Sequence, residues 1–154
     1  MRDSRWYLCG LAAVIVLGLG AVSCENVNKL SELTGPTPNL SPSFASIERD
    51  IISSSDSSGR ASCVSCHTSQ GRTPAGALDL SGNAFGALVN VASRQKSGAI
   101  MVVPGDPDNS YLIQKLEGTS GIVGLRMPRN GPPFLGDGQV QIIRRWILLG
   151  AKND

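Results

Sequence analysis

Residues Cys63-Val64-Ser65-Cys66-His67 form the most informative segment of the sequence, because two residues separate its two cysteines and a histidine follows directly. This histidine is the only one in the 154-residue chain. The rest of the sequence is poor in aromatic side chains, which make up 5% of the residues. Aromatic rings usually supply a large part of a core. The sequence therefore indicates that another large apolar group fills part of the interior.

The spacing of these cysteines and the histidine is that of c-type haem attachment. Two thiols separated by two residues can form thioethers with the two vinyl groups on one edge of a porphyrin. The histidine that follows can bind the iron as its proximal ligand. We therefore predict that Cys63 and Cys66 attach one haem c and that His67 binds its iron.

Three other uses of the same residues stay open. A dithiol redox motif opens a helix in a βαβ unit, and no such unit is predicted here. A structural zinc ion needs four Cys or His ligands, and only Cys63, Cys66 and His67 are available. A Cys63–Cys66 disulfide would suit an exported protein.

A second axial ligand cannot be another histidine of this chain. Two methionines follow the N-terminal segment, Met101 and Met127. Met101 lies in the apolar run 99–103, where we expect it to fill the core. Met127 lies in the Gly- and Pro-rich loop 124–133, which is stiff enough to present one thioether. We expect Met127 to be the distal iron ligand, with Met101, water or a vacant position as alternatives.

The N-terminal segment reads as an export signal. Arg2 and Arg5 precede the uncharged, largely apolar run 6–23, and Cys24 follows. A basic start followed by a short apolar run is typical of secretory signals, and the basic end stays in the cytoplasm. Residues 21–24 resemble the lipobox of bacterial lipoproteins, which implies cleavage after Ser23 and lipidation of Cys24. An uncleaved anchor and an ordinary signal are the alternatives.

The remaining chain divides into a spacer and one domain. Residues 24–43 are rich in Pro, Ser and Thr, and we expect a flexible spacer there. Residues 44–154 are predicted to form an all-α domain with long Gly- and Pro-rich loops at 53–81 and 118–136. Helices are expected near 41–51, 84–92, 106–118 and 137–150. In the first, Phe44, Ile47 and Ile51 share one apolar face and Ser41 is the cap. Asp106-Pro107 starts the third and Gly118 stops it, and Asp137 caps the last, whose apolar face includes Gly150.

Together these features resemble the class I monohaem c-type cytochromes. The resemblance spans about residues 43–152. It depends on the Cys63–His67 stretch, Met127-Pro128, the final helix 143–151 and the segment 103–112. It implies four to five short helices wrapped around one covalent haem, with the first and last helices packed together. It also implies His67/Met127 ligation and one-electron transfer rather than enzymatic turnover.

These expectations define partners and location. Redox partner proteins bound at the membrane are expected, with the chain lipid-anchored on the periplasmic or outer-facing side of a bacterial membrane. It would act as a free carrier or as the cytochrome subunit of a respiratory or photosynthetic complex. The formal net charge of +2 argues against a nucleic-acid partner.

Other functions stay open beside electron transfer. One is a haem enzyme or a gas or redox sensor in which Met127 leaves the iron. Another is a structural lipoprotein with a Cys63–Cys66 disulfide. Arg72, Arg126 and Arg129 are read as haem propionate neighbours, as a docking rim or as solvated loop charges.

Overall fold

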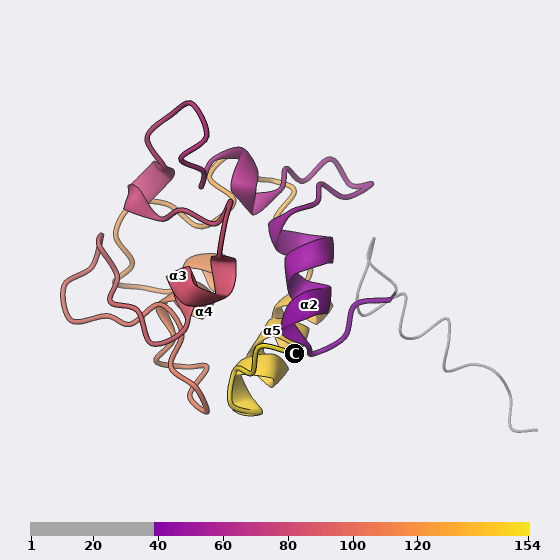
Figure 1. Ribbon diagram of the computed structural model, residues 1–154, viewed down its shortest axis with the longest axis vertical. Coiled ribbons are helices and arrows are strands. Elements are labelled where there is room, and N and C mark those ends of the chain that lie inside the picture. The colour runs from indigo at the N-terminus through magenta and orange to yellow at the C-terminus, as the bar shows by residue number, and fades with distance from the viewer. Residues whose placement is uncertain (1–38) are drawn as a thin grey trace, which may run out of the picture.

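A computed structural model describes residues 39–154, which fold into short helices joined by long loops (Figure 1). The predicted signal, Cys24 and most of the spacer lie outside the described residues. The elements in chain order are α2 (Phe44–Ile47), a π-helical turn (Glu48–Ile52), 3₁₀ turns (Cys63–Ser65 and Ala75–Ala77), α3 (Ala84–Leu88), α4 (Tyr111–Glu117) and α5 (Asp137–Leu148). Within this region only isolated β-bridges occur and no sheet forms. The all-α prediction is confirmed for this part of the chain.

The first helix begins two residues later than its sequence signal suggested. Ser43, not Ser41, is the N-cap: its extended backbone lets its Oγ accept a hydrogen bond from Ser46 N at 3.3 Å. Ser41 N instead donates to Ser46 Oγ at 3.0 Å. Leu40 is buried, so the packed part of the chain begins within the segment expected to be a spacer.

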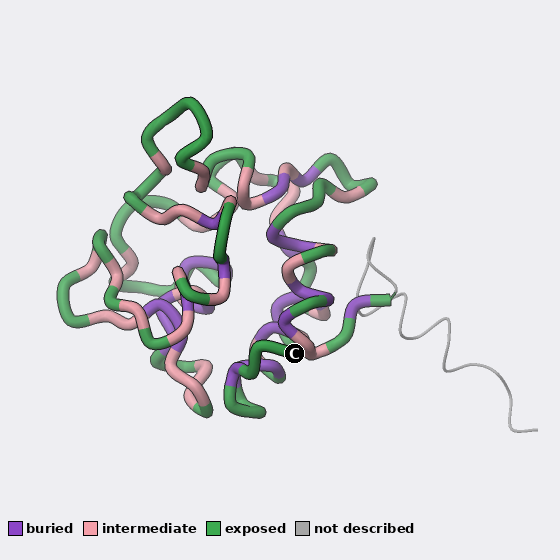
Figure 2. The backbone as a smooth tube through the Cα atoms, viewed as in Figure 1, coloured by how far each residue is buried: buried purple, intermediate pink, exposed green. Residues whose placement is uncertain are grey.

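Aromatic contacts join the first, middle and last parts of the domain. The Phe44 ring lies 5.4 Å from the Trp146 ring of α5 and 5.2 Å from the Phe85 ring of α3, in an edge-on arrangement in the second case. Ala45 N donates to Asp154 O at 2.9 Å, and Figure 1 shows the C-terminus beside the start of α2. The sides of α2 and α5 in this region are buried, whereas the outer loops are exposed (Figure 2).

The last two helices differ from their predicted limits. Gly136, not Asp137, precedes α5, and Gln139 Oε1 accepts a hydrogen bond from Gly136 N at 2.8 Å. The helix ends at Leu148, so Gly150 lies beyond it rather than on its apolar face. Asp106 does not cap α4, because its carboxylate closes a separate turn by accepting from Asn109 N at 3.1 Å.

The other end of α4 agrees with expectation. Gly118 ends the helix in the left-handed conformation, at φ 74°. Met101 lies in the apolar core, also as expected. No helix of residues 39–154 has the length and apolar character needed to cross a bilayer.

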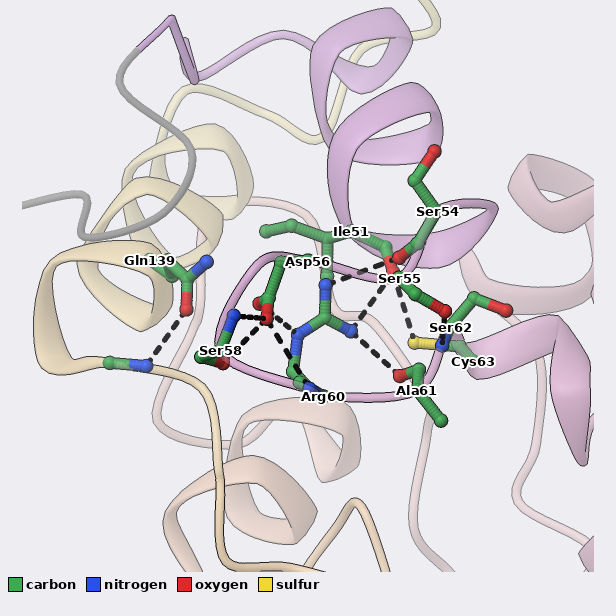
Figure 3. A network of polar contacts seen from close by, with 11 residues as sticks. Ile51, Ser54, Ser55, Asp56, Ser58, Arg60, Ala61, Ser62, Cys63 and Gln139 are labelled. Carbon is green, nitrogen blue, oxygen red and sulfur yellow. Dashed lines mark hydrogen bonds and ion pairs between the residues drawn. The ribbon is translucent and has the colours of Figure 1, made fainter.

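A buried ion pair organises the loop that leads to Cys63. The side chains of Arg60 and Asp56 are 1% and 3% exposed, and Arg60 Nε lies 2.8 Å from Asp56 Oδ2. The same guanidinium donates to backbone carbonyls of Ile51, Ser54 and Ala61 at 3.0–3.3 Å (Figure 3). Burial alone would raise the pKa of Asp56, but hydrogen bonds from Ser58 and Arg60 outweigh it and hold this pKa below its usual range. The network ties the loop to the π-helical turn.

Replacing this carboxylate should therefore be costly. We expect Asp56→Asn to lower the free energy of unfolding by about 3–5 kcal/mol at neutral pH, because it leaves a buried guanidinium without its counter-ion. Since the folded-state pKa is lowered, the carboxylate stabilises the fold above its unfolded pKa of about 4 and loses this effect as pH falls through the folded value.

Denaturant unfolding of both proteins from neutral pH downward measures this difference. The gap between them should narrow in acid, where the wild-type carboxyl is also neutral. Asp50→Asn serves as the matched control, because its partner Arg49 is 63% exposed. Equal costs for the two variants at neutral pH would contradict the expectation.

Candidate functional site

The Cys63–His67 stretch forms a tight turn that backbone hydrogen bonds fix at both ends. Cys66 N and His67 N both donate to Cys63 O, at 3.2 and 2.9 Å. Ala75 N donates to Cys66 O at 3.1 Å and Leu80 N donates to His67 O at 2.9 Å. The following loop thus folds back over the turn, and the two cysteines and the histidine are held on one short rigid segment.

Both thiols of this turn are free. Cys63 is half-buried, and its Sγ lies 3.7 Å from Ile51 O, the same carbonyl that accepts from Arg60 (Figure 3). Burial raises the pKa of the Cys63 thiol, although the nearby Arg60 charge acts in the opposite direction. Cys66 is exposed. Both sulfur atoms are therefore available to form thioethers without prior reduction of a disulfide.

A backbone hydrogen bond orients the ring of His67. Its Nδ1 lies 2.9 Å from Ala75 O. A carbonyl oxygen can only accept a hydrogen bond, so Nδ1 carries the proton and Nε2 keeps its lone pair. This is the arrangement by which a second partner fixes the tautomer of a metal-binding histidine.

The surroundings of His67 favour its neutral form. Burial lowers the pKa of His67, contacts with the backbone of Ala75 and Leu78 act the other way, and the positive charge of Lys115 adds to the lowering. A neutral imidazole is the form that binds a metal.

The loop that carries Met127 is bound to α4. Met127 N donates to Lys115 O at 2.8 Å. Tyr111 Oη accepts from Val123 N at 3.0 Å, and Lys115 Nζ donates to Val123 O and Leu125 O at 2.8 and 2.6 Å. Met127 itself is half-buried against the core. Lys115 is thus the residue of α4 that holds the loop carrying the predicted distal ligand.

The three arginines singled out in the sequence have different surroundings. Arg126 Nε donates to Leu116 O at 2.7 Å, and its guanidinium lies 4.3 Å above the centre of the Phe134 ring. Arg72 donates to Ser65 O at 3.0 Å from an exposed position, and Arg129 is exposed. Arg126 thus helps to fix the Met127 loop, and no contact assigns a haem-facing role to any of the three.

The residues present fit a covalently attached haem. A histidine with a free Nε2, two free thiols on the preceding turn and a thioether on a braced loop are the donors that this group requires. Half-buried apolar side chains border the core and can cover a flat apolar ring; they include Leu78, Phe85, Val89, Leu112 and Ile122. The described residues hold no cluster of three or more His, Cys, Asp or Glu side chains that could bind a metal ion without such a group.

Sequence reasoning missed two residues of this region, Arg60 and Lys115. Both are long cations that are buried, at 1% and 6% exposure, and both donate to loop carbonyls. Lys115 had a detectable signal, because it stands four residues after Tyr111 on the apolar side of α4. Arg60 had none, since it lies in an irregular loop.

Comparison with known proteins adds no relative. No protein-family model, curated protein or solved structure matches this chain.

The junction between α4 and the Met127 loop offers a matched test of packing. A Cβ on Gly118 would lie 3.0–3.1 Å from the Arg126 side chain, whereas one on Gly124 would meet nothing within 4 Å. Both glycines have φ of +74°. Gly124→Ala should therefore cost about 1–2 kcal/mol for the backbone alone, and Gly118→Ala should cost more. Thermal denaturation of both variants measures this, and equal losses would show that Arg126 moves aside freely.

Proposed function

We propose that this protein is a monohaem c-type cytochrome that transfers single electrons. The observation that carries the proposal is the His67 ring, whose Nδ1 donates to Ala75 O at 2.9 Å and whose Nε2 therefore keeps its lone pair, on the same turn as two free thiols. The cytochrome-like arrangement of the helices and the identity of the haem belong to the same proposal.

Each residue of the site has one task in this scheme. Cys63 and Cys66 would hold the haem through thioethers, His67 would bind its iron through Nε2, and Met127 would supply a thioether sulfur as the second ligand. Such a haem would exchange one electron between its ferric and ferrous states. The half-buried apolar side chains that border the core would shield the bound ring from water.

Location and partners complete the proposal. The basic, apolar and cysteine-ended N-terminal segment supports export and lipidation at Cys24, which would tether the domain to the outer-facing or periplasmic side of a bacterial membrane. Its partners would be membrane-associated redox proteins that it meets transiently. Weak charge complementarity suffices for such encounters.

Covalent haem attachment is the first consequence to test. Full-length protein produced together with the c-type haem attachment machinery should give a pyridine haemochrome spectrum of haem c, with one haem per chain. Cys63→Ala should change the spectrum, because one vinyl group stays unreacted, and Cys63→Ala with Cys66→Ala should abolish covalent attachment.

Wild-type protein without covalent haem would contradict the central claim and favour the structural lipoprotein. A ferric protein whose high-spin spectrum shifts with peroxide or carbon monoxide would favour the haem enzyme or sensor. A low-spin spectrum that ignores both ligands supports the electron carrier.

The distal ligand can be tested by exchanging its chemistry. Met127→His should lower the midpoint potential and remove the weak far-red methionine–iron charge-transfer band, because imidazole favours ferrous iron less than a thioether does. Met101→Leu is the matched control, since Met101 is buried in the core and should leave both quantities unchanged. If the band survives in Met127→His, Met127 is not the ligand.

A further inference from the structure

We propose that Lys115 is a positioning residue for the distal ligand and a fixed positive charge that favours the reduced state of the site. This inference rests on the proposed function and extends it to a residue of α4 that contributes no predicted iron ligand. The charge of Lys115 would thereby set part of the midpoint potential of the site.

Most of the hydrogen bonds between α4 and the Met127 loop involve Lys115. Its Nζ donates to Val123 O at 2.8 Å and Leu125 O at 2.6 Å, and its own carbonyl accepts from Met127 N at 2.8 Å. Tyr111 Oη accepts from Val123 N one turn earlier, so α4 holds both polar groups of Val123. One lysine thus bonds to three residues of the five that end at Met127.

The positive charge of Lys115 has no carboxylate partner among residues 39–154. The ion pairs of that region involve Arg49, Arg60 and Arg144, and the nearest groups to the ammonium are carbonyl oxygens. Its residue is 6% exposed, so water screens this charge poorly. Burying a cation without a counter-ion is unfavourable. Neutral donors could bond to the same carbonyls without this penalty, so hydrogen bonding alone does not account for a charged side chain here.

A buried charge of this kind acts on the iron site. Lys115 lies beside the predicted distal ligand, because its carbonyl accepts from Met127 N at 2.8 Å and its Nζ donates to Leu125 O, two residues before Met127. Gaining an electron lowers the net positive charge at the iron by one unit, and a nearby fixed cation favours the state with less positive charge. Lys115 therefore raises the midpoint potential by its charge and holds Met127 in place by its hydrogen bonds, two effects that variants can separate.

The experiment uses the full-length haem-loaded protein and three variants. Lys115→Met keeps the length of the side chain but removes the charge and the donor. Lys115→Arg keeps the charge. Lys96→Met is the matched control, because Lys96 also lies beside Tyr111, with its Nζ 5.4 Å from the centre of that ring, but bonds to Gln114 rather than to the Met127 loop.

Two quantities are measured on each protein. Lys115→Met should lower the midpoint potential and speed hydrogen exchange at the Val123 and Met127 amides, which donate to Tyr111 Oη and Lys115 O, on the order of tenfold, because their loop loses two charge-assisted bonds. Lys115→Arg should keep the potential near the wild-type value even where exchange is faster. Lys96→Met should change neither quantity. If Lys115→Met alters neither, or Lys96→Met alters both equally, the inference is wrong while the haem assignment stands.

A measurement on the unaltered protein covers the case in which Lys115→Met fails to fold. Acetylation by a limiting amine reagent, read out by mass spectrometry, should modify Lys115 on the order of tenfold more slowly than the exposed Lys152. This protection should fall in Met127→Ala, which frees the loop. Equal reactivity of Lys115 and Lys152 would overturn the inference, and the absence of covalent haem in wild-type protein would overturn it together with the proposed function.

Discussion

Backbone carbonyls in the long loops need hydrogen-bond donors, and buried cations supply them. A loop that packs against a core cannot leave these groups unpaired, and residues 53–62 and 118–127 have no helix or sheet to satisfy them. Arg60 donates to carbonyls before Cys63, and Lys115 donates to carbonyls before Met127. The two segments that carry the predicted haem-binding residues are therefore each fixed by one buried side chain of the same chemical kind.

The two cations differ in how their charge is balanced. Arg60 has Asp56 at 2.8 Å, so its charge is neutralised locally and its role is structural. Among residues 39–154, Lys115 has only carbonyl dipoles for partners, so its charge is not neutralised locally. This difference connects the packing of the loops to the proposed redox chemistry, because an uncompensated charge close to an iron site changes its preference between two oxidation states.

Much of the helical framework could be predicted from the sequence. The period of Phe44, Ile47 and Ile51, the stop at Gly118 and the burial of Met101 are local properties, and each agrees with the structure. The caps were predicted less well. Ser41, Asp106 and Asp137 are all favourable cap residues, but Ser41 bonds to Ser46 through its backbone, Asp106 accepts from Asn109 N, and Asp137 lies inside α5. Which of several adjacent polar residues caps a helix depends on the backbone angles of the turn before it.

Residue types and short separations are enough to predict the reactive groups of this chain: one histidine, two cysteines at haem-attachment spacing and one methionine in a stiff loop. How these groups are held depends on the folded chain. His67 carries its proton on Nδ1 because Ala75 O, eight residues away, accepts a hydrogen bond there. Met127 is held in position because its backbone N donates to Lys115 O of α4. Hydrogen bonds between distant segments leave no periodic trace in a sequence, because they form wherever the folded loops bring a donor to a carbonyl.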